Sequence, residues 1–175
     1  MIIIADGGST KCDWAVVDNT TATIVKQFQT EGLNPFVRTE EDMLSLLKTE
    51  VTPQISTYNI DRVFFYGAGV TPEKSSYMAS LFATIFATAD ITATSDMDGA
   101  ARGTVADGDG IVAILGTGSN TTAYTSGKPT DKVAALGYIL GDEGSGAVLG
   151  KQLVSDIFKG VAPQHIVAQF EEKYG

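Results

Sequence analysis

Residues 2–17 read Ile2-Ile3-Ile4-Ala5-Asp6-Gly7-Gly8-Ser9-Thr10-Lys11-Cys12-Asp13-Trp14-Ala15-Val16-Val17, with a glycine-rich turn between two apolar runs. The second run follows the turn directly as a strand pattern. A strand-turn-strand hairpin is therefore predicted, and not a strand that leads into a helix. The turn offers backbone N–H groups and hydroxyls from Gly8, Ser9, Thr10 and Lys11, and tight clusters of such groups bind phosphate. This hairpin is the first candidate phosphate site.

A second stretch repeats the same plan. The loop Gly116-Thr117-Gly118-Ser119-Asn120 follows an apolar run at residues 111–115 and precedes a strand pattern at residues 121–124. Other glycine-rich phosphate sites fit less well, because no G-x-x-x-x-G-K-[ST] string occurs and the first loop lacks the third glycine of the dinucleotide fingerprint. For either loop alone, a plain turn without a ligand is the alternative. Two hairpins of one design favour a nucleotide held between two related half-structures.

The composition argues against several classes of protein. The chain has 175 residues, a net charge of −9 and a pI of about 4.4, whereas nucleic-acid binders concentrate Lys and Arg. Cys12 is the only cysteine, which rules out an internal disulfide or a four-cysteine metal site. His165, the only histidine, lies in a late amphipathic segment, which argues against a histidine-dependent triad. Without a basic leader or an apolar run of about 18 residues, we expect a cytoplasmic protein with no membrane partner.

Hydrophobic periodicity predicts an α/β protein. Strands are expected at residues 2–5, 12–18, 22–28, 62–66 and 91–94. Helices are expected to start at a capping box of Thr39 and Asp42, at Thr71-Pro72, and shortly after Asp96. This order of elements, three strands followed by alternating helices and strands, predicts a mixed sheet with helices on both faces.

The repeated hairpin divides the chain into two expected domains. Residues 1–110 hold one complete α/β unit, and residues 111–175 begin a second one with hairpin strands and a helix after a glycine-rich turn at 141–146. Because fewer residues follow position 110 than precede it, we expect the second domain to be incomplete.

Phosphoryl transfer to a hydroxyl requires positioning, charge neutralisation by Mg²⁺ and a carboxylate that accepts the proton. Asp6, at the mouth of the first loop, is the candidate for holding Mg²⁺ through its water shell; its alternative is a hydrogen bond to its own turn. Asp96 lies where a strand gives way to a helix, at the edge where α/β proteins bind ligands, and is the candidate general base. The alternative is that Asp96 or Asp98 caps that helix.

Further candidates surround the two loops. The hydroxyls of Ser9, Thr10, Thr117 and Ser119 either bind phosphate oxygens or satisfy their own hairpins, and Lys11 either reaches a phosphate or is solvated. The stretch Gly141-Asp142-Glu143-Gly144-Ser145-Gly146 opens a helix, whose N–H groups and dipole favour an anionic or polyhydroxyl ligand. The same residues are also compatible with an ordinary helix start.

Four strings, in this order and spacing, resemble the BadF/BadG/BcrA/BcrD ATPase family and, within it, the N-acetylglucosamine kinases. They are Asp6-Gly7-Gly8-Ser9-Thr10-Lys11, Asp96-Met97-Asp98-Gly99-Ala100, Gly116-Thr117-Gly118-Ser119-Asn120 and Gly137-Tyr138-Ile139-Leu140-Gly141-Asp142-Glu143-Gly144-Ser145. The family belongs to the actin, Hsp70 and sugar-kinase superfamily, in which two ribonuclease-H-like domains close over ATP.

The resemblance implies an ATP- and Mg²⁺-dependent enzyme with an amino-sugar substrate. It implies that Thr10 and Thr117 contact ATP phosphates and that Asp96 is the catalytic base at the bound sugar. It further implies that Asn34 and Asp142 bind the amino sugar, with Gly137 in the sugar-contacting turn.

The expected function is therefore ATP-dependent phosphorylation of N-acetylglucosamine, or a related amino sugar, at the 6-hydroxyl. One alternative is an inactive sugar- or nucleotide-binding module. Another is an ATPase activator of a radical dehydratase, but that role needs cysteines for an interfacial iron–sulfur cluster and Cys12 is on the wrong element. The resemblance puts the adenine-binding elements beyond Gly175, so we expect little kinase activity from these 175 residues alone. The oligomeric state, a homodimer included, is left open.

Overall fold

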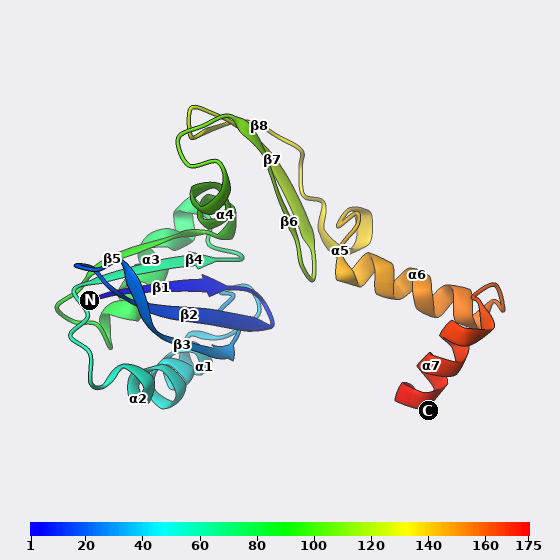
Figure 1. The fold of residues 1–175 in the computed structure, drawn as a ribbon, viewed down its shortest axis with the longest axis horizontal. Coiled ribbons are helices and arrows are strands. Elements are labelled where there is room, and N and C mark those ends of the chain that lie inside the picture. Colours follow the sequence, from blue (N-terminus) through cyan, green and yellow to red (C-terminus); the bar gives the residue numbers. More distant parts are fainter. The chain divides into compact units, whose positions relative to one another are not determined.

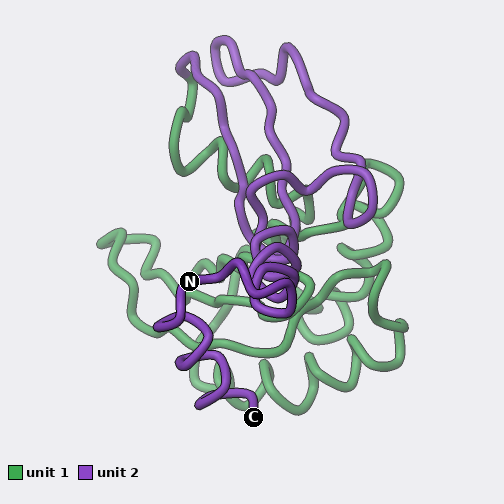
Figure 2. Tube along the Cα trace, turned by 90° about the vertical axis from the view of Figure 1, so that its right-hand side faces the viewer, with its two compact units in different colours: residues 1–107 green, residues 108–175 purple.

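Five strands form one mixed sheet in the first part of the chain (Figure 1). The computed structural model describes residues 1–175 and divides them into unit 1, Met1–Asp107, and unit 2, Gly108–Gly175 (Figure 2). The sheet of unit 1 has the order β3-β2-β1-β4-β5. Its strands are β1 (Ile2–Gly7), β2 (Lys11–Asp18), β3 (Thr23–Glu31), β4 (Arg62–Gly67) and β5 (Asp90–Ser95).

The direction of the strands matches the predicted hairpin. Strand β2 pairs antiparallel with both β1 and β3, whereas β4 is parallel to β1 and β5 is parallel to β4. The carboxyl ends of β1, β4 and β5 therefore meet at one edge of the sheet, next to the turn between β1 and β2. This is the edge at which α/β proteins bind ligands.

One face of the sheet carries the core of unit 1. A row of buried residues crosses four neighbouring strands in register, with Trp14, Ala5, Phe65 and Ala93 side by side. Two helical segments complete this core: one is α1 (Glu40–Leu46), η1 (Leu47–Val51) and α2 (Thr52–Ile55), and the other is α3 (Pro72–Ala83). The rings of Phe65 and Phe82 lie 4.8 Å apart between sheet and α3.

Helix α4 (Asp96–Thr104) contacts β1, β4 and β5 through the other face. A Cβ at Gly99 would lie 2.7 Å from Tyr66 Cβ, so only glycine lets the helix approach the strand this closely. Because Tyr66 alternates with the core residue Phe65 along β4, it points to the face opposite the core. The predicted mixed sheet with helices on both faces is confirmed.

Several elements extend past their predicted bounds. Strand β3 continues to Glu31, and the first helical segment continues past Val51 to Ile55 although Pro53 lacks an N–H group. The segment widens to a π-helical turn at Leu47–Val51, and Thr52 Oγ1 donates to the Leu47 carbonyl at 3.1 Å. A side-chain donor thus serves one of the carbonyls near the proline.

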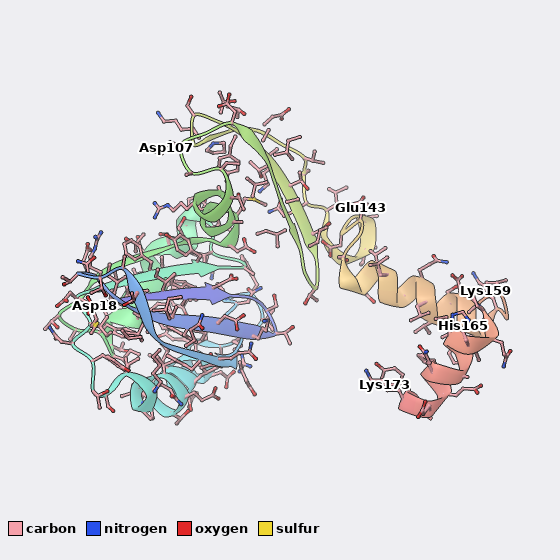
Figure 3. All side chains as sticks on the ribbon, in the orientation of Figure 1. Asp18, Asp107, Glu143, Lys159, His165 and Lys173 are labelled. Carbon is pink, nitrogen blue, oxygen red and sulfur yellow. The ribbon has the colours of Figure 1, made fainter.

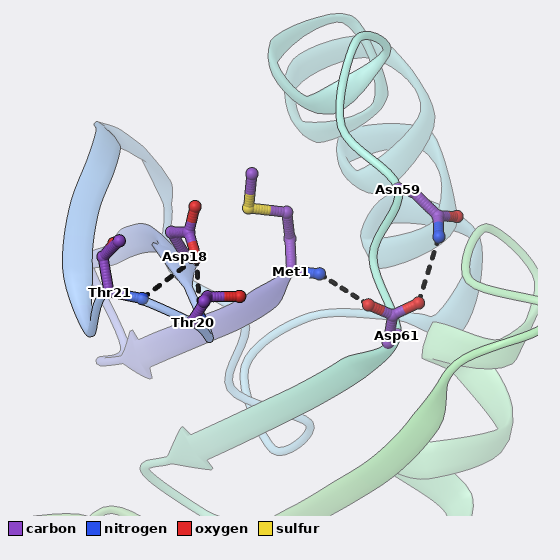
Figure 4. Close-up of polar contacts among 6 residues, drawn as sticks. All are labelled: Met1, Asp18, Thr20, Thr21, Asn59 and Asp61. Carbon is purple, nitrogen blue, oxygen red and sulfur yellow. Dashed lines mark hydrogen bonds and ion pairs between the residues drawn. The ribbon is translucent and has the colours of Figure 1, made fainter.

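The edge of the sheet opposite the phosphate loop is held by polar contacts (Figure 4). The Met1 amino group lies 2.6 Å from Asp61 Oδ2, and Asn59 donates to the same carboxylate at 3.0 Å. In the turn between β2 and β3, Asp18 accepts the backbone N–H groups of Thr20 and Thr21. The start of β1 is thereby tied to the residue that precedes β4, and a side chain closes the turn between β2 and β3.

Unit 2 consists of a three-stranded antiparallel sheet followed by helices. The sheet has the order β6-β7-β8, and helices α6 and α7 extend away from it (Figure 1). The elements are β6 (Gly110–Leu115), β7 (Ser119–Thr125), β8 (Lys128–Lys132), α5 (Gly137–Leu140), α6 (Gly146–Phe158) and α7 (Gln164–Tyr174). His165 lies exposed on α7 (Figure 3). None of the helices combines the length and the apolar character needed to cross a bilayer.

Candidate active site

The first phosphate loop sits directly on the core of unit 1. A Cβ at Gly7 would lie 2.6 Å from Cε2 of the buried Phe65 ring, so the end of β1 can pass over this ring only as glycine. The Gly8 N–H donates to the Lys11 carbonyl at 2.8 Å and closes the turn. Gly8 is a predicted phosphate donor, but its N–H already donates within the turn. Because glycine has no side chain, a ligand could still approach the backbone closely at this position.

The segment after β3 supports the same loop from outside. The Gly32 N–H donates to the Thr10 carbonyl at 3.0 Å, and a Cβ at Gly32 would lie 2.5 Å from the Gly8 carbonyl oxygen. Asn34 Nδ2 donates to Ser9 Oγ at 2.8 Å. Gly32 is the one local sign in the sequence that another backbone comes close to this loop.

A row of polar side chains crosses the sheet at the level of Asp6, on the face opposite the core. The strand register places Asp13 of β2 on one side of Asp6 and Tyr66 of β4 on the other. Gln29 of β3 and Thr94 of β5 form the two ends of the row. Gln29 Nε2 donates to Asp13 Oδ1 at 2.7 Å, and at the other end Thr94 Oγ1 donates to the Asp98 carboxylate. One polar residue from each strand thus lines the mouth of the phosphate loop.

Asp96 is the first residue of α4, but it is not the cap. Ser95 occupies the N-cap position, and its Oγ accepts the Asp98 N–H at 3.2 Å. The alternative that Asp96 or Asp98 caps this helix is therefore wrong. The signal for Ser95 is local, since Ser followed three residues later by an acid is a helix-start pattern. Asp96 Oδ1 accepts the Met97 N–H at 2.9 Å, which leaves Oδ2 for other partners.

Burial raises the pKa of Asp96 above its usual range, and the carboxylates of Asp6 and Asp98 raise it further, against a lowering by the Met97 N–H. The pKa of Asp6 is raised by partial burial and then by Asp13, against a lowering by Lys11. Strands β1 and β5 are separated by β4, so their backbones lie roughly 10 Å apart, and the Asp6 carboxylate contributes to the raised pKa of Asp96. Two carboxylates with raised pKa therefore flank one strand end, which is typical of a functional site.

Lys11 is already paired. Its Nζ lies 2.8 Å from Asp13 Oδ2, and both side chains are exposed. This hydrogen bond, followed by the one from Gln29, holds the pKa of Asp13 below its usual range. Exposed ion pairs are weak, so the ammonium group can leave Asp13 for a phosphate oxygen at little cost.

Asp6 fits a hydrated Mg²⁺ ion. No group of three or more histidine, cysteine or acidic side chains is close enough to bind a metal directly. Mg²⁺ keeps several of its waters and accepts few protein ligands, so a single carboxylate at the mouth of a phosphate loop is sufficient. A cation there would also offset the repulsion between Asp6 and Asp13 that contributes to the raised pKa of Asp6.

The second phosphate loop, in unit 2, is organised around Asp142. Its Oδ1 accepts the Ser119 N–H at 3.1 Å, and a Cβ at Gly118 would lie 2.9 Å from the same oxygen. The Gly116 N–H donates to the Gly118 carbonyl at 2.9 Å, so this predicted phosphate donor also serves its own turn. Asp142, predicted as a sugar ligand, thus lies against the second phosphate loop.

The start of α6 is occupied by protein groups. The Gly146 and Ala147 N–H groups donate to the carbonyls of Gly116 and Thr117 at 2.9 and 3.3 Å, and the Val148 N–H donates to Ser145 Oγ at 3.2 Å. The expectation that these N–H groups bind a ligand is wrong, because the second loop uses them. Ser145 is fully buried as the N-cap, which agrees with the alternative that this stretch is an ordinary helix start.

Gly137 starts the short helix α5 with a positive φ of 72°. Its carbonyl accepts the Gly141 N–H at 2.8 Å, so the turn leads directly into Asp142. Unit 1 therefore brings Asp6, Ser9 and Asn34 to one edge of its sheet with Asp96, and unit 2 brings its loop, Asp142 and the Gly137 turn together.

Comparison with solved structures finds sugar kinases that share this fold. No protein-family model matches the sequence, and no curated protein sequence matches it. Among solved structures, a candidate N-acetylglucosamine kinase from Porphyromonas gingivalis is 40% identical with a TM-score of 0.92, over 100% of this chain and 62% of that one. A candidate N-acetylglucosamine kinase from Chromobacterium violaceum is 18% identical with a TM-score of 0.68, over 89% and 56% of the two chains.

A ROK family glucokinase from Streptomyces griseus, solved with glucose and AMPPNP, is 19% identical with a TM-score of 0.63, over 89% of this chain and 59% of that one. The chain thus spans less than two thirds of the length of these proteins. At identities below 20% the second and third matches establish the fold alone. The predicted α/β fold of the actin-like sugar kinases is confirmed.

Proposed function

We propose that this protein is an ATP-dependent kinase that phosphorylates N-acetylglucosamine, or a related amino sugar, at the 6-hydroxyl. The observation that carries the proposal is Asp96, a carboxylate with a raised pKa that starts α4 at the sheet edge of the first phosphate hairpin. The 40% identity over the whole chain to a candidate N-acetylglucosamine kinase supports the substrate class. Membership of the BadF/BadG/BcrA/BcrD ATPase family is part of the same proposal.

In the proposed reaction, Asp96 accepts the proton of the sugar 6-hydroxyl. As the hydroxyl oxygen bonds to the γ-phosphorus of ATP, the bond from that phosphorus to the β–γ bridging oxygen breaks, and ADP leaves with the electron pair. A base works best with a pKa near the working pH, so the raised pKa of Asp96 suits this role. The Met97 N–H holds the carboxylate in one orientation.

The remaining candidates would bind and orient the two substrates. Mg²⁺, when bound, neutralises charge that develops on the phosphates, and Asp6 would hold it through its water shell. Hydroxyls of both loops would donate to phosphate oxygens, with Lys11 as the cation in unit 1. These hydroxyls belong to Ser9, Thr10, Thr117 and Ser119. Asn34, Gly137 and Asp142 would line the sugar side.

The second candidate function is a sugar- or nucleotide-binding module without turnover. It is favoured by unit 2, where α6 and α7 bury no residue. We propose that residues 1–110 are a complete ribonuclease-H-like domain and that residues 111–175 begin a second one. A dehydratase activator is not proposed, because Cys12 is fully buried on β2.

A coupled kinase assay tests the proposal. The full-length protein is given Mg²⁺ and ATP with N-acetylglucosamine, N-acetylmannosamine, glucose or no sugar, and the phosphorylated position of the product is assigned by NMR. Turnover that depends on an amino sugar and yields the 6-phosphate supports the kinase. Equal or faster turnover on glucose, or without sugar, contradicts the amino-sugar assignment. Sugar and nucleotide binding without turnover favours the binding module.

A further inference from the structure

The amide of Asn34 makes two hydrogen bonds that fix which way it faces. Its Oδ1 accepts the backbone N–H of Phe36 at 2.9 Å, and its Nδ2 donates to Ser9 Oγ at 2.8 Å. A backbone N–H can only donate, so the atom that faces Phe36 must be oxygen, and the atom that faces Ser9 is therefore nitrogen. Asn34 is 8% exposed, so water competes little for either bond.

Neighbouring backbone holds the amide in this position. The carbonyl of Asn34 accepts the N–H groups of Val37 and Arg38, both at 3.0 Å. On the other side, a Cβ at Gly69 would lie 2.4 Å from Asn34 Oδ1, and Gly69 has a φ of 78° that favours glycine. The amide is thus enclosed, and it cannot turn away from Ser9 without breaking its bond to Phe36.

The Asn34 bond decides what Ser9 can still do. A serine hydroxyl has one O–H to donate and two lone pairs to accept with. Because Asn34 donates to Ser9 Oγ, one lone pair is used and the O–H stays available to donate elsewhere. Phosphate oxygens only accept, so a hydroxyl held in this state suits a phosphate ligand.

We propose that Asn34 is a positioning residue for nucleotide binding, which orients the Ser9 hydroxyl as a donor to a phosphate oxygen. This inference rests on the proposed function, because it takes the phosphate to be that of ATP. Asn34 acts through Ser9, in addition to any contact its second amide N–H makes with a sugar. Sugar and nucleotide would then depend on the same side chain, and any effect of one on the affinity for the other would be reciprocal.

The test measures nucleotide binding without sugar. The chain is titrated with AMPPNP and Mg²⁺, and the Kd is followed by the ¹H–¹⁵N NMR shifts of the first loop in wild type, Ser9→Ala, Asn34→Ala and the double variant. We expect each single change to weaken binding by about 2- to 12-fold, as loss of one hydrogen bond does. The double variant should be no weaker than Ser9→Ala, because both changes remove one interaction. Asn19→Ala, an exposed asparagine in the turn between β2 and β3, is the matched control.

The remaining outcomes separate the two proposals. If wild type binds and the folded Asn34→Ala variant, checked by its NMR spectrum, keeps the wild-type Kd for AMPPNP, the positioning role is wrong and the kinase proposal stands. Effects that multiply in the double variant also overturn it, because Asn34 then acts independently of Ser9. If wild type binds neither AMPPNP with Mg²⁺ nor inorganic tripolyphosphate at millimolar concentration, the proposed function is overturned and this inference with it.

Discussion

Units 1 and 2 carry candidate phosphate loops of the same design on different supports. In unit 1 the loop lies on the Phe65 ring, within a core that joins five strands to two helical segments. In unit 2 the loop is held by hydrogen bonds from Ser119 to Asp142 and from the start of α6. Side chains fill the space between sheet and helices in unit 1, whereas along α6 and α7 they project from the helices (Figure 3).

The difference shows that a loop sequence does not specify what supports it. Burial of apolar surface stabilises by roughly 25 cal/mol per Å², and unit 1 has many such contacts beneath its loop. In unit 2 large apolar side chains stay exposed, with Ile139 at 87% and Phe158 at 80%. Hydrogen bonds alone contribute less and open more readily, so the first loop should be the more rigid of the two.

The largest expected effect concerns the chemistry assigned to unit 1. Asp96→Asn should lower kcat by about 10²–10⁴-fold and leave sugar affinity nearly unchanged, because asparagine cannot accept the proton but can still accept the Met97 N–H. The measurement is steady-state kinetics of the full-length protein with N-acetylglucosamine, relative to wild type in the same preparation. Asp98→Asn, which changes the neighbouring acid, is the control. A loss below about tenfold in Asp96→Asn would argue for a structural role.

Two phenylalanine substitutions, one in each unit, test whether unit 1 has a packed core and unit 2 does not. Phe65→Ala should lower the free energy of unfolding by about 3–5 kcal/mol, because it leaves a cavity in the core under the first loop. Phe158→Ala, at the end of α6, should change it by no more than about 0.5 kcal/mol, since that ring is 80% exposed. Denaturant unfolding of both variants measures the difference. Equal losses would mean that Phe158 is buried in solution and that the contrast is wrong.

Hydrogen exchange extends the comparison to the loops. The Gly32 amide, bonded to the Thr10 carbonyl in unit 1, should exchange more slowly than the Ser119 amide, bonded to Asp142 in unit 2. The reason is that opening the first loop disturbs packed backbone at Gly8 and Gly32, whereas opening the second breaks a half-buried hydrogen bond between Ser119 and Asp142. Amide exchange followed by NMR gives both rates after correction for intrinsic exchange. Faster exchange at Gly32 would reverse the order of rigidity.

The smallest effect is on stability as a function of pH. Because the pKa of Asp96 is raised in the folded chain, the fold holds this proton more tightly than the unfolded chain does, and its charge costs stability at neutral pH. Asp96→Asn should therefore raise the Tm at pH 7, and the gain should shrink as the pH falls through the raised pKa. Thermal unfolding from pH 7 to pH 4 measures this. A gain that persists or grows at pH 4 would rule out the charge of Asp96 as its cause.

Much of the fold could be predicted from local patterns. Both hairpins, the helix start at Thr39 and the helix from Pro72 are read from alternation, capping and proline placement, and each of these signals spans only a few residues. The same capping rules could also have predicted Ser95 as the N-cap of α4. Site roles remain predictions for every candidate, although the sheet does bring Asp6 and Asp96 to one edge.

The sequence by itself thus determined which residues are strand, turn and helix, because those preferences act between near neighbours. Only the tertiary structure decided the polar row around Asp6, the bond from Asn34 to Ser9 and the use of the α6 N–H groups by the second loop. Asn34 and Ser9 lie 25 positions apart in the sequence, and the N–H groups of α6 lie about 30 positions from the loop carbonyls that accept them. Their partners depend on strand register and on packing, which no local pattern records.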